Sequence, residues 1–82
     1  MSEIKVTVRL FASLRESVGH GRLDVVLPPG SAAAGAWSAI PGVEPLPPAG
    51  TRYAVNGDWA APDQHLHDGD EVALILPVSG GC

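Results

Sequence analysis

The sequence has one cysteine, few aromatic side chains and few basic ones. A single cysteine, Cys82, excludes an internal disulfide and a thiolate metal cluster. The five Lys and Arg residues are outnumbered by nine Asp and Glu, and no basic run marks a nucleic-acid or anionic-membrane partner. Apolar runs are far shorter than the ~20 residues that cross a bilayer, and the N-terminus lacks a signal-peptide pattern. We therefore expect a cytoplasmic protein with no nucleic-acid or membrane partner.

Groups that carry catalysis are equally scarce. His65 and His67 are two residues apart, but no third ligand lies near them in the sequence, and zinc needs three or four protein ligands. Asp68-Gly69-Asp70 lacks the further oxygen ligands of a calcium loop, so it predicts a turn. No glycine-rich phosphate loop precedes a helix. The chain is therefore expected to bind no metal or cofactor and not to be an enzyme by itself.

The residues that are present predict short strands separated by turns, since 10 Gly and 8 Pro punctuate the chain. Residues 4–10 and 23–27 alternate apolar and polar side chains, which indicates two strands with one buried face. Between them, Phe11, Leu14 and Val18 have the spacing of one face of a short helix that ends at Gly19. Arg15 and Glu16 would then face solvent.

The second half begins with a helix predicted over residues 32–40, with Ser31 as N-cap and Trp37 and Ile40 on its buried side. Four prolines make residues 41–50 a loop. Asn56-Gly57 is a strong hairpin signal. It would join strands at 53–55 and 58–60, and a last strand would cover 71–76.

This order predicts an α+β fold with a mixed sheet and a helix packed on one face, in which the first and last strands pair in the middle. That arrangement is the ubiquitin-like β-grasp. Residues 1–82 would form a single domain, and residues 76–82 a flexible tail that leaves the end of the central strand. Taken alone, Gly80-Gly81 would be typical of a frayed terminus, although it could also thread a backbone through a channel too narrow for side chains.

Four segments of the chain change that interpretation. They are Phe11-Ala12-x-Leu14-Arg15-Glu16, Ala54-Val55-Asn56, Asp68-Gly69-Asp70-Glu71-Val72-Ala73 and Pro77-Val78-Ser79-Gly80-Gly81. The chain resembles the MoaD/ThiS family, and in particular the small sulfur-carrier subunit of molybdopterin synthase. The thiamine sulfur carrier and other ubiquitin-like proteins belong with this family. The resemblance covers nearly the whole chain, with the four segments in the family's order.

The resemblance implies a function for the tail. An E1-like adenylating enzyme would use ATP to activate the Gly81 carboxylate, and a sulfur donor would convert it to a thiocarboxylate. The tail would then enter the large synthase subunit and donate sulfur in molybdenum cofactor biosynthesis. Because Gly80 has no side chain, it would let the tail pass through a narrow channel of the partner enzyme. The stem, which spans about 10–14 Å when extended, would be Pro77, Val78 and Ser79.

Partner enzymes would need a docking surface on the folded domain. Ile75 is expected to face outward from the sheet and, with Trp59 and Phe11, to form an exposed apolar patch. The alternative for Trp59 and Phe11 is ordinary core packing.

Cys82 departs from the family pattern, which ends on Gly-Gly. We expect a processing protease, such as a metalloprotease, to remove it. Alternatives are that Cys82 itself carries persulfide sulfur, or that it is foreign to the natural chain. Two other functions stay open as well. The acceptor pathway could be that of thiamine, cysteine or a secondary metabolite, or the chain could be a ubiquitin-like protein modifier that forms isopeptide bonds.

Overall fold

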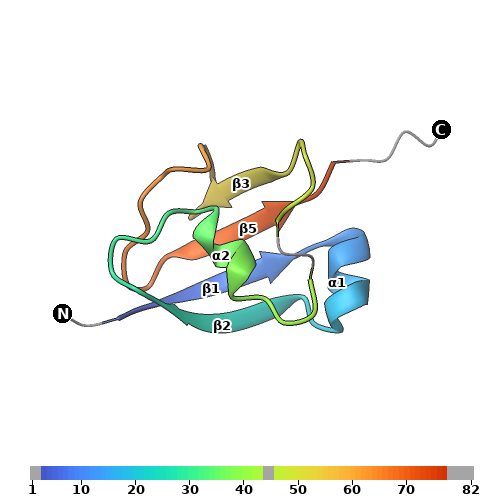
Figure 1. Ribbon diagram of the computed structural model, residues 1–82, viewed down its shortest axis with the longest axis horizontal. Helices are drawn as coiled ribbons and strands as arrows, with labels where there is room; N and C mark the ends of the chain where they lie inside the picture. Colours follow the sequence, from blue (N-terminus) through green and yellow to red (C-terminus); the bar gives the residue numbers. More distant parts are fainter. Residues whose placement is uncertain (1–2, 44–45, 78–82) are drawn as a thin grey trace.

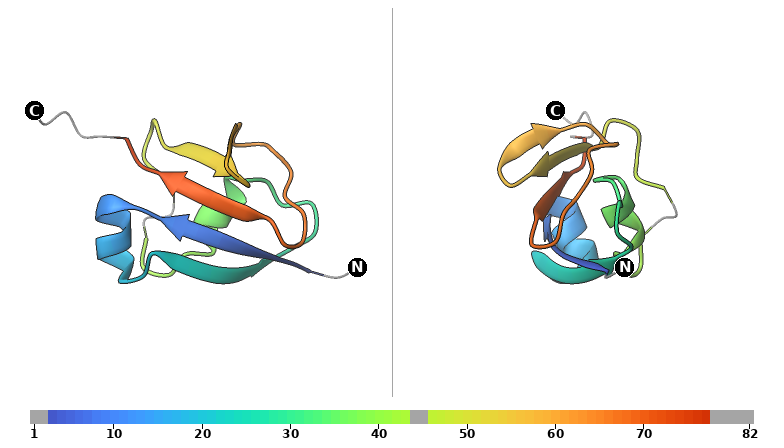
Figure 2. Two further views of the ribbon diagram at one scale, coloured as in Figure 1. Left: turned by 180° about the vertical axis from the view of Figure 1, so that it is seen from behind. Right: turned by 90° about the vertical axis from the view of Figure 1, so that its left-hand side faces the viewer.

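The computed structural model describes residues 3–43 and 46–77 (Figures 1 and 2). The elements are β1 (Ile4–Leu10), α1 (Ala12–Val18), β2 (Arg22–Leu27), α2 (Gly35–Ser38), β3 (Arg52–Val55), β4 (Asp58–Ala60) and β5 (Glu71–Ile75). The strands form one five-stranded sheet in the order β2-β1-β5-β3-β4. β1 and β5 are parallel neighbours in its middle, and the other pairs are antiparallel. The predicted mixed sheet and its central strand pair are confirmed.

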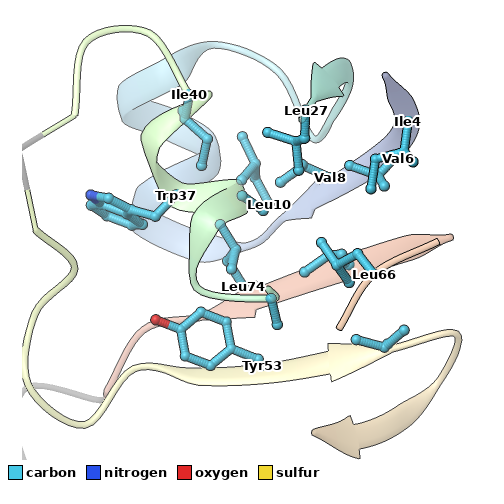
Figure 3. Close-up of a cluster of buried hydrophobic side chains, with 14 of the residues drawn as sticks. Ile4, Val6, Val8, Leu10, Leu27, Trp37, Ile40, Tyr53, Leu66 and Leu74 are labelled. Atoms are coloured by element: carbon cyan, nitrogen blue, oxygen red, sulfur yellow. The ribbon is translucent and has the colours of Figure 1, made fainter. Parts of the chain in front are cut away.

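One face of the sheet carries the core. Alternation along β1 and β5 points Val8, Leu10, Val72 and Leu74 inward, where they are almost completely buried. α2 and its flanking loops cover this face, while α1 lies at the end of the sheet where β5 terminates (Figures 1 and 2). Trp37 and Ile40, from α2 and the residues that follow it, belong to the same buried cluster, which is drawn in Figure 3. We call the opposite, uncovered side of the sheet the open face.

The helix predicted over residues 32–40 is mostly wrong, because α2 spans only Gly35–Ser38. Ser31 does not cap it. The Ser31 hydroxyl donates a 2.7 Å hydrogen bond to the Pro28 carbonyl, and the N-cap position is Ala34, which makes no side-chain capping bond. Trp37 and Ile40 are nevertheless buried, as predicted.

Contacts with a distant loop explain the shorter helix. The backbone N–H of Ala33 donates to the Gln64 carbonyl at 2.8 Å, and that of Ala34 donates to the Pro62 carbonyl at 2.9 Å. Ala32 also forms an isolated antiparallel bridge with His65. These bonds hold residues 32–34 outside the helix, and Gly35 adds a low helix propensity at its first position. The same loop buries Leu66, which the sequence placed in an ordinary connection.

The predicted turns and strand bounds are close to those observed. Asn56 and Gly57 have φ of 52° and 88°, the two left-handed conformations that a type I′ hairpin needs. Gly19, with φ of 91°, ends α1 and donates its N–H to the Arg15 carbonyl at 2.8 Å. β2 and β3 each begin one residue earlier than predicted, and β5 ends one residue earlier, at Ile75.

Candidate functional site: the tail root and the open face

The root of the predicted tail is the end of β5. This strand is bonded on both sides, to β1 and to β3, so its last residues are held by two neighbours. Leu76 then packs against the core from the edge, while Pro77 is exposed. The 46–50 loop lies beside the root, where a Cβ atom at Gly50 would be in van der Waals contact with Pro77, and Gly50 has φ of 89°, a conformation that favours glycine. The tail therefore starts from a fixed point.

Of the predicted tail, residues 76–82, only Leu76 and Pro77 belong to the described part of the chain, and Leu76 packs against the core instead of being part of a free tail. The others, which carry the predicted chemistry and its processing, lie outside the described residues: Val78, Ser79, Gly80, Gly81 and Cys82.

The open face next to the root is arranged in rows across the sheet. Cross-strand register aligns one row that contains, from β2 to β4, Arg22, Arg9, Ala73, Ala54 and Trp59. Nearer to the root, β5 and β3 add a further pair, Ile75 and Arg52. The middle of these rows consists of the apolar residues Ala73, Ala54 and Ile75. Arginine and tryptophan side chains lie at their borders.

Two of the three predicted patch residues come together. Trp59 is 67% exposed, so it does not belong to the core. With Ile75 and Arg52 it lines a groove of about 430 Å³ that also includes Gly50, Leu76 and Pro77; we call this the tail groove. The Arg52 guanidinium lies 5.7 Å from the centre of the Trp59 ring, a cation–π distance.

Phe11 occupies a different place from the one its spacing predicted. It precedes α1 in an extended conformation, with φ of −129° and ψ of 158°, and it is 43% exposed. It therefore does not share the inward helix face of Leu14 and Val18. Its ring lies 5.7 Å from the Arg9 guanidinium and lines a separate hollow, on the β1–β2 side of the root.

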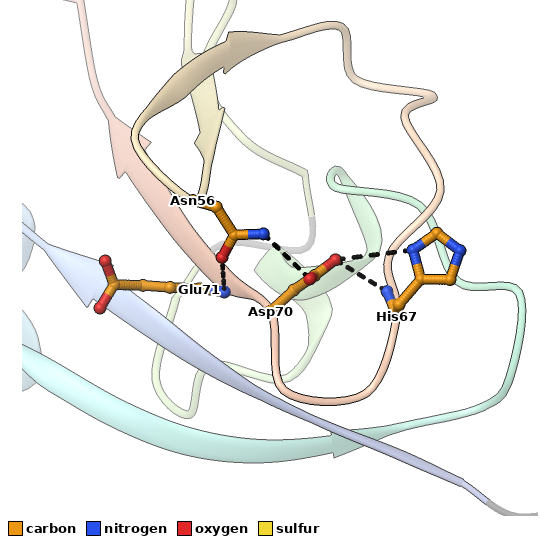
Figure 4. A network of polar contacts seen from close by, with 4 residues as sticks. All are labelled: Asn56, His67, Asp70 and Glu71. Atoms are coloured by element: carbon orange, nitrogen blue, oxygen red, sulfur yellow. Dashed lines mark hydrogen bonds and ion pairs between the residues drawn. The ribbon is translucent and has the colours of Figure 1, made fainter.

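The opposite end of the sheet is a closed polar network, drawn in Figure 4. Asn56 donates from Nδ2 to Asp70 at 3.0 Å and accepts the Glu71 N–H on Oδ1 at 3.0 Å. Asp70 also accepts the His67 N–H at 2.8 Å. The Asn56 hydrogen bond, followed by that from His67, lowers the pKa of the Asp70 carboxyl below its ordinary value. Sequence reasoning missed these contacts, although Asn56 and Asp70 both stood in recognised turn motifs.

The same turn also anchors β1. Asp68 accepts the Lys5 N–H at 2.8 Å, and the Gly69 N–H donates to the Lys5 carbonyl at 2.7 Å. Gly69 has φ of 89°, a conformation that favours glycine. Asp68-Gly69-Asp70 is thus a turn, as predicted. Its oxygens bond to the chain's own donors, and the described residues contain no group of three or more His, Cys, Asp or Glu placed to hold a metal.

Together, the mixed sheet, the central parallel pair of first and last strands, and the covered inner face define a ubiquitin-like β-grasp domain. The sequence profile of the ThiS family matches residues 8–81, and the chain belongs to this family of ubiquitin-like sulfur carriers and modifiers. Its small proteins are carriers rather than enzymes, and the MoaD/ThiS proteins work with an E1-like enzyme and a large synthase subunit.

Solved structures agree with that assignment. SAMP1, the small archaeal modifier protein 1 of Haloferax volcanii, is 29% identical over 94% of this chain and 99% of its own, with a TM-score of 0.76. A putative molybdopterin converting factor subunit 1 from Pyrococcus furiosus is 27% identical over 92% and 99%, with a TM-score of 0.71. A ubiquitin from Caldiarchaeum subterraneum shares the fold at 20% identity, over 98% and 100%, with a TM-score of 0.64.

Among the described residues, neither α1 nor α2 is long and apolar enough to cross a membrane.

Proposed function

We propose that this chain is a sulfur carrier for molybdenum cofactor biosynthesis, working from the carboxyl group of Gly81. The observation that carries the proposal is the position of β5. A central strand bonded on both sides leads directly into Pro77 and the Gly-Gly segment, so the domain can hold out its C-terminal end from a rigid base. The family match ends at Gly81, and the similarity to the Pyrococcus converting-factor subunit favours the molybdenum cofactor as the destination.

The chemistry takes place on partner enzymes. A free carboxylate is a poor electrophile, so an E1-like enzyme first lets a Gly81 carboxylate oxygen attack the α-phosphorus of ATP. Pyrophosphate leaves, and an acyl-adenylate forms. A persulfide sulfur of the donor then attacks the carbonyl carbon and expels AMP. A second thiol cleaves the resulting acyl disulfide, which leaves the thiocarboxylate on Gly81 and a disulfide on the donor side.

Cys82 determines when this sequence can begin. While its peptide bond to Gly81 is intact, Gly81 has no free carboxylate to adenylate. We therefore include in the proposal a processing step, catalysed by a protease such as a metalloprotease, that removes Cys82. The large synthase subunit would then receive the processed tail.

Intact mass spectrometry tests the proposal. The chain ending at Gly81 and the chain ending at Cys82 are each incubated with ATP, the adenylating enzyme and a persulfide donor. We expect the first to gain the mass difference of one oxygen replaced by sulfur, and the second to stay unchanged until it is trimmed. A control ending at Gly80 separates the need for a terminal glycine from the need for Gly81 itself. Sulfur transfer by the untrimmed chain would overturn the trimming step and favour Cys82 as the persulfide carrier.

A second candidate function is protein modification, which the similarity to SAMP1 favours. The activated Gly81 carbonyl would then be attacked by a lysine amine, with AMP leaving and an isopeptide bond forming. The same incubation in a cell extract distinguishes the two functions, since lysine-linked adducts indicate modification and a thiocarboxylate indicates carriage. A carrier for thiamine, cysteine or a secondary metabolite would give the same thiocarboxylate, and only the acceptor enzyme that consumes it would differ.

A further inference from the structure

The basic side chains of the open face are not spread evenly. The two rows nearest the tail root contain three arginines, Arg9, Arg22 and Arg52, and no carboxylate. The next row away from the root aligns Asp24, Thr7 and Glu71. A chain of net charge −4 thus presents a positive end on the face beside its tail.

A fourth arginine joins this end from α1. Arg9, Arg15 and Arg22 line a hollow of about 330 Å³ together with Leu10, Phe11 and Gly21, which we call the arginine hollow. Gly21 leaves space for the Arg15 side chain. A Cβ atom at Gly21 would lie 3.2 Å from Nε of Arg15, so this side chain would have to shift by a few tenths of an ångström. None of the described residues that line the hollow is acidic.

Folding alone does not account for this cluster. Arg9 and Arg22 are direct partners across the β1–β2 pair, and like charges in that position destabilise a sheet. Within the described ranges, Arg9 is the only arginine in an ion pair, with Glu71 at 3.5 Å. Arg15, Arg22 and Arg52 have no carboxylate partner there. Arg52 lies over the Trp59 ring, and the guanidinium groups of Arg15 and Arg22 are available to a partner molecule.

We propose that the arginine hollow binds an acidic segment of the E1-like adenylating enzyme, so that the surface that docks on this enzyme has an apolar centre and an arginine border. This inference rests on the proposed function, because it takes the tail to enter a partner enzyme. The apolar centre is Ala73, Ala54 and Ile75, with Trp59 and Phe11 exposed on either side. An apolar centre with a polar border, rich in Arg and Trp, is typical of protein interfaces.

Nucleic acid fits this surface poorly. Phosphate backbones repeat negative charge at short intervals and require a basic stripe, whereas the row of Asp24 and Glu71 borders the arginines directly. Carboxylates of a partner can instead be placed singly, each forming paired hydrogen bonds with one planar guanidinium.

Charge reversal with a matched control tests the inference. Arg15→Glu and Arg22→Glu are made singly and together, and Lys5→Glu serves as the control. Lys5 is exposed, lies on the open face at the far end of β1, and undergoes the same change of charge as each single arginine variant. Arg22→Lys retains the charge but loses the planar fork. Thermal unfolding of each variant establishes that the fold is intact.

Two measurements follow on the chain that ends at Gly81, the form that presents a free carboxylate. The first is kcat/KM for adenylation by the E1-like enzyme at low and high salt. Arg15→Glu/Arg22→Glu should lower it about tenfold or more at low salt, mainly through KM, and the difference should shrink at high salt. Lys5→Glu should change it little. The second is NMR titration with a hexaglutamate peptide, which should shift signals of residues lining the hollow in the wild type and in Lys5→Glu but not in the double variant.

The outcomes separate this inference from the proposed function. If the wild type is activated and the double variant equals Lys5→Glu in both measurements, the docking inference is wrong and the proposed function stands. If no chain is activated, the proposed function fails, and the peptide titration alone decides whether the hollow binds carboxylates. Inorganic phosphate that shifts the same signals more strongly than the peptide would indicate an anion site instead and overturn the inference.

Discussion

The two ends of the sheet use polar residues in opposite ways. At the Asp68–Asp70 end, carboxylates and the Asn56 amide bond to backbone and side-chain groups of the chain itself. At the tail end, three of four arginines have no ion-pair partner among the described residues, and Trp59 and Phe11 lie in solvent. The polar groups at the first end stabilise the fold. The arginines and exposed aromatic rings at the tail end remain accessible to a partner protein.

This difference indicates which end of the sheet binds a partner, because the side chains at the tail end are energetically unfavourable when no partner covers them. Polar groups that satisfy one another need no further explanation, whereas clustered like charges and exposed aromatic rings are unfavourable for a lone monomer. They become favourable once a partner covers them. Mutations at the tail end should therefore change binding and leave stability nearly constant, and mutations at the other end should do the reverse.

The largest effect is expected for Trp59→Asp. This change puts a charge into the apolar part of the tail groove, and we expect it to weaken binding of the adenylating enzyme by ~2 kcal/mol or more, a loss of about thirtyfold. The free energy of unfolding should fall by no more than about 1 kcal/mol, the span of strand propensities. Calorimetric binding and urea unfolding measure the two quantities.

Val26→Asp provides the matched control for Trp59→Asp. Val26 of β2 is 51% exposed on the same face. Its cross-strand partner on β1 is Lys5, so it lies at the end of the sheet far from the tail root. It should reproduce any strand-propensity loss without the binding defect. Equal binding losses in both variants would remove the distinction between the two ends. Unfolding of Trp59→Asp alone would show that the exposed Trp59 ring stabilises the fold, for example through its contact with Arg52.

The second effect lies at the network end. Asn56→Gly keeps the left-handed turn but removes the bonds to Asp70 and Glu71, which should cost about 1–2 kcal/mol of stability. Asn56→Ala should cost ~1 kcal/mol more, because a Cβ residue without a polar side chain is strained at φ of 52°. Adenylation kinetics should be unchanged in both. A kinetic defect in Asn56→Gly at full stability would show that this end also contacts the partner.

Sequence reasoning succeeded where a pattern reports directly on local structure. Alternation in residues 4–10 determines which side chains face inward, and Asn56-Gly57 selects its turn whatever surrounds it. It failed where distant residues decide. Ala33 and Ala34 are held by carbonyls of Gln64 and Pro62, some thirty positions along the chain, so propensity could not predict the short α2.

The candidate site shows the same limit. The alternation of side chains along the last strand predicted that Ile75 faces outward, on the docking face. For Trp59 and Phe11 the sequence left two alternatives open, an exposed patch or core packing. Arg9, Arg15 and Arg22 are scattered in the sequence and come together through the β1–β2 register and the turn of α1, so only the structure reveals the arginine hollow.

The smallest effect concerns acid stability. Hydrogen bonds from Asn56 and His67 hold the pKa of Asp70 below its ordinary value, so the unfolded chain binds this proton more tightly than the folded one. The stabilisation is therefore fully present above about pH 4 and is lost as pH falls through the lowered folded pKa.

Asp70→Asn removes this titration. At pH 7 the variant should lose less stability than Asn56→Gly, since its amide oxygen can still accept one hydrogen bond. Below about pH 4 its free energy of unfolding should fall less steeply with falling pH than that of the wild type. Other carboxylates titrate in both proteins, so the difference between the two urea-unfolding curves is the measurement. Parallel curves would mean that Asp70 is as easily protonated in the folded chain as in the unfolded one, and that the network at this end does not depend on its charge.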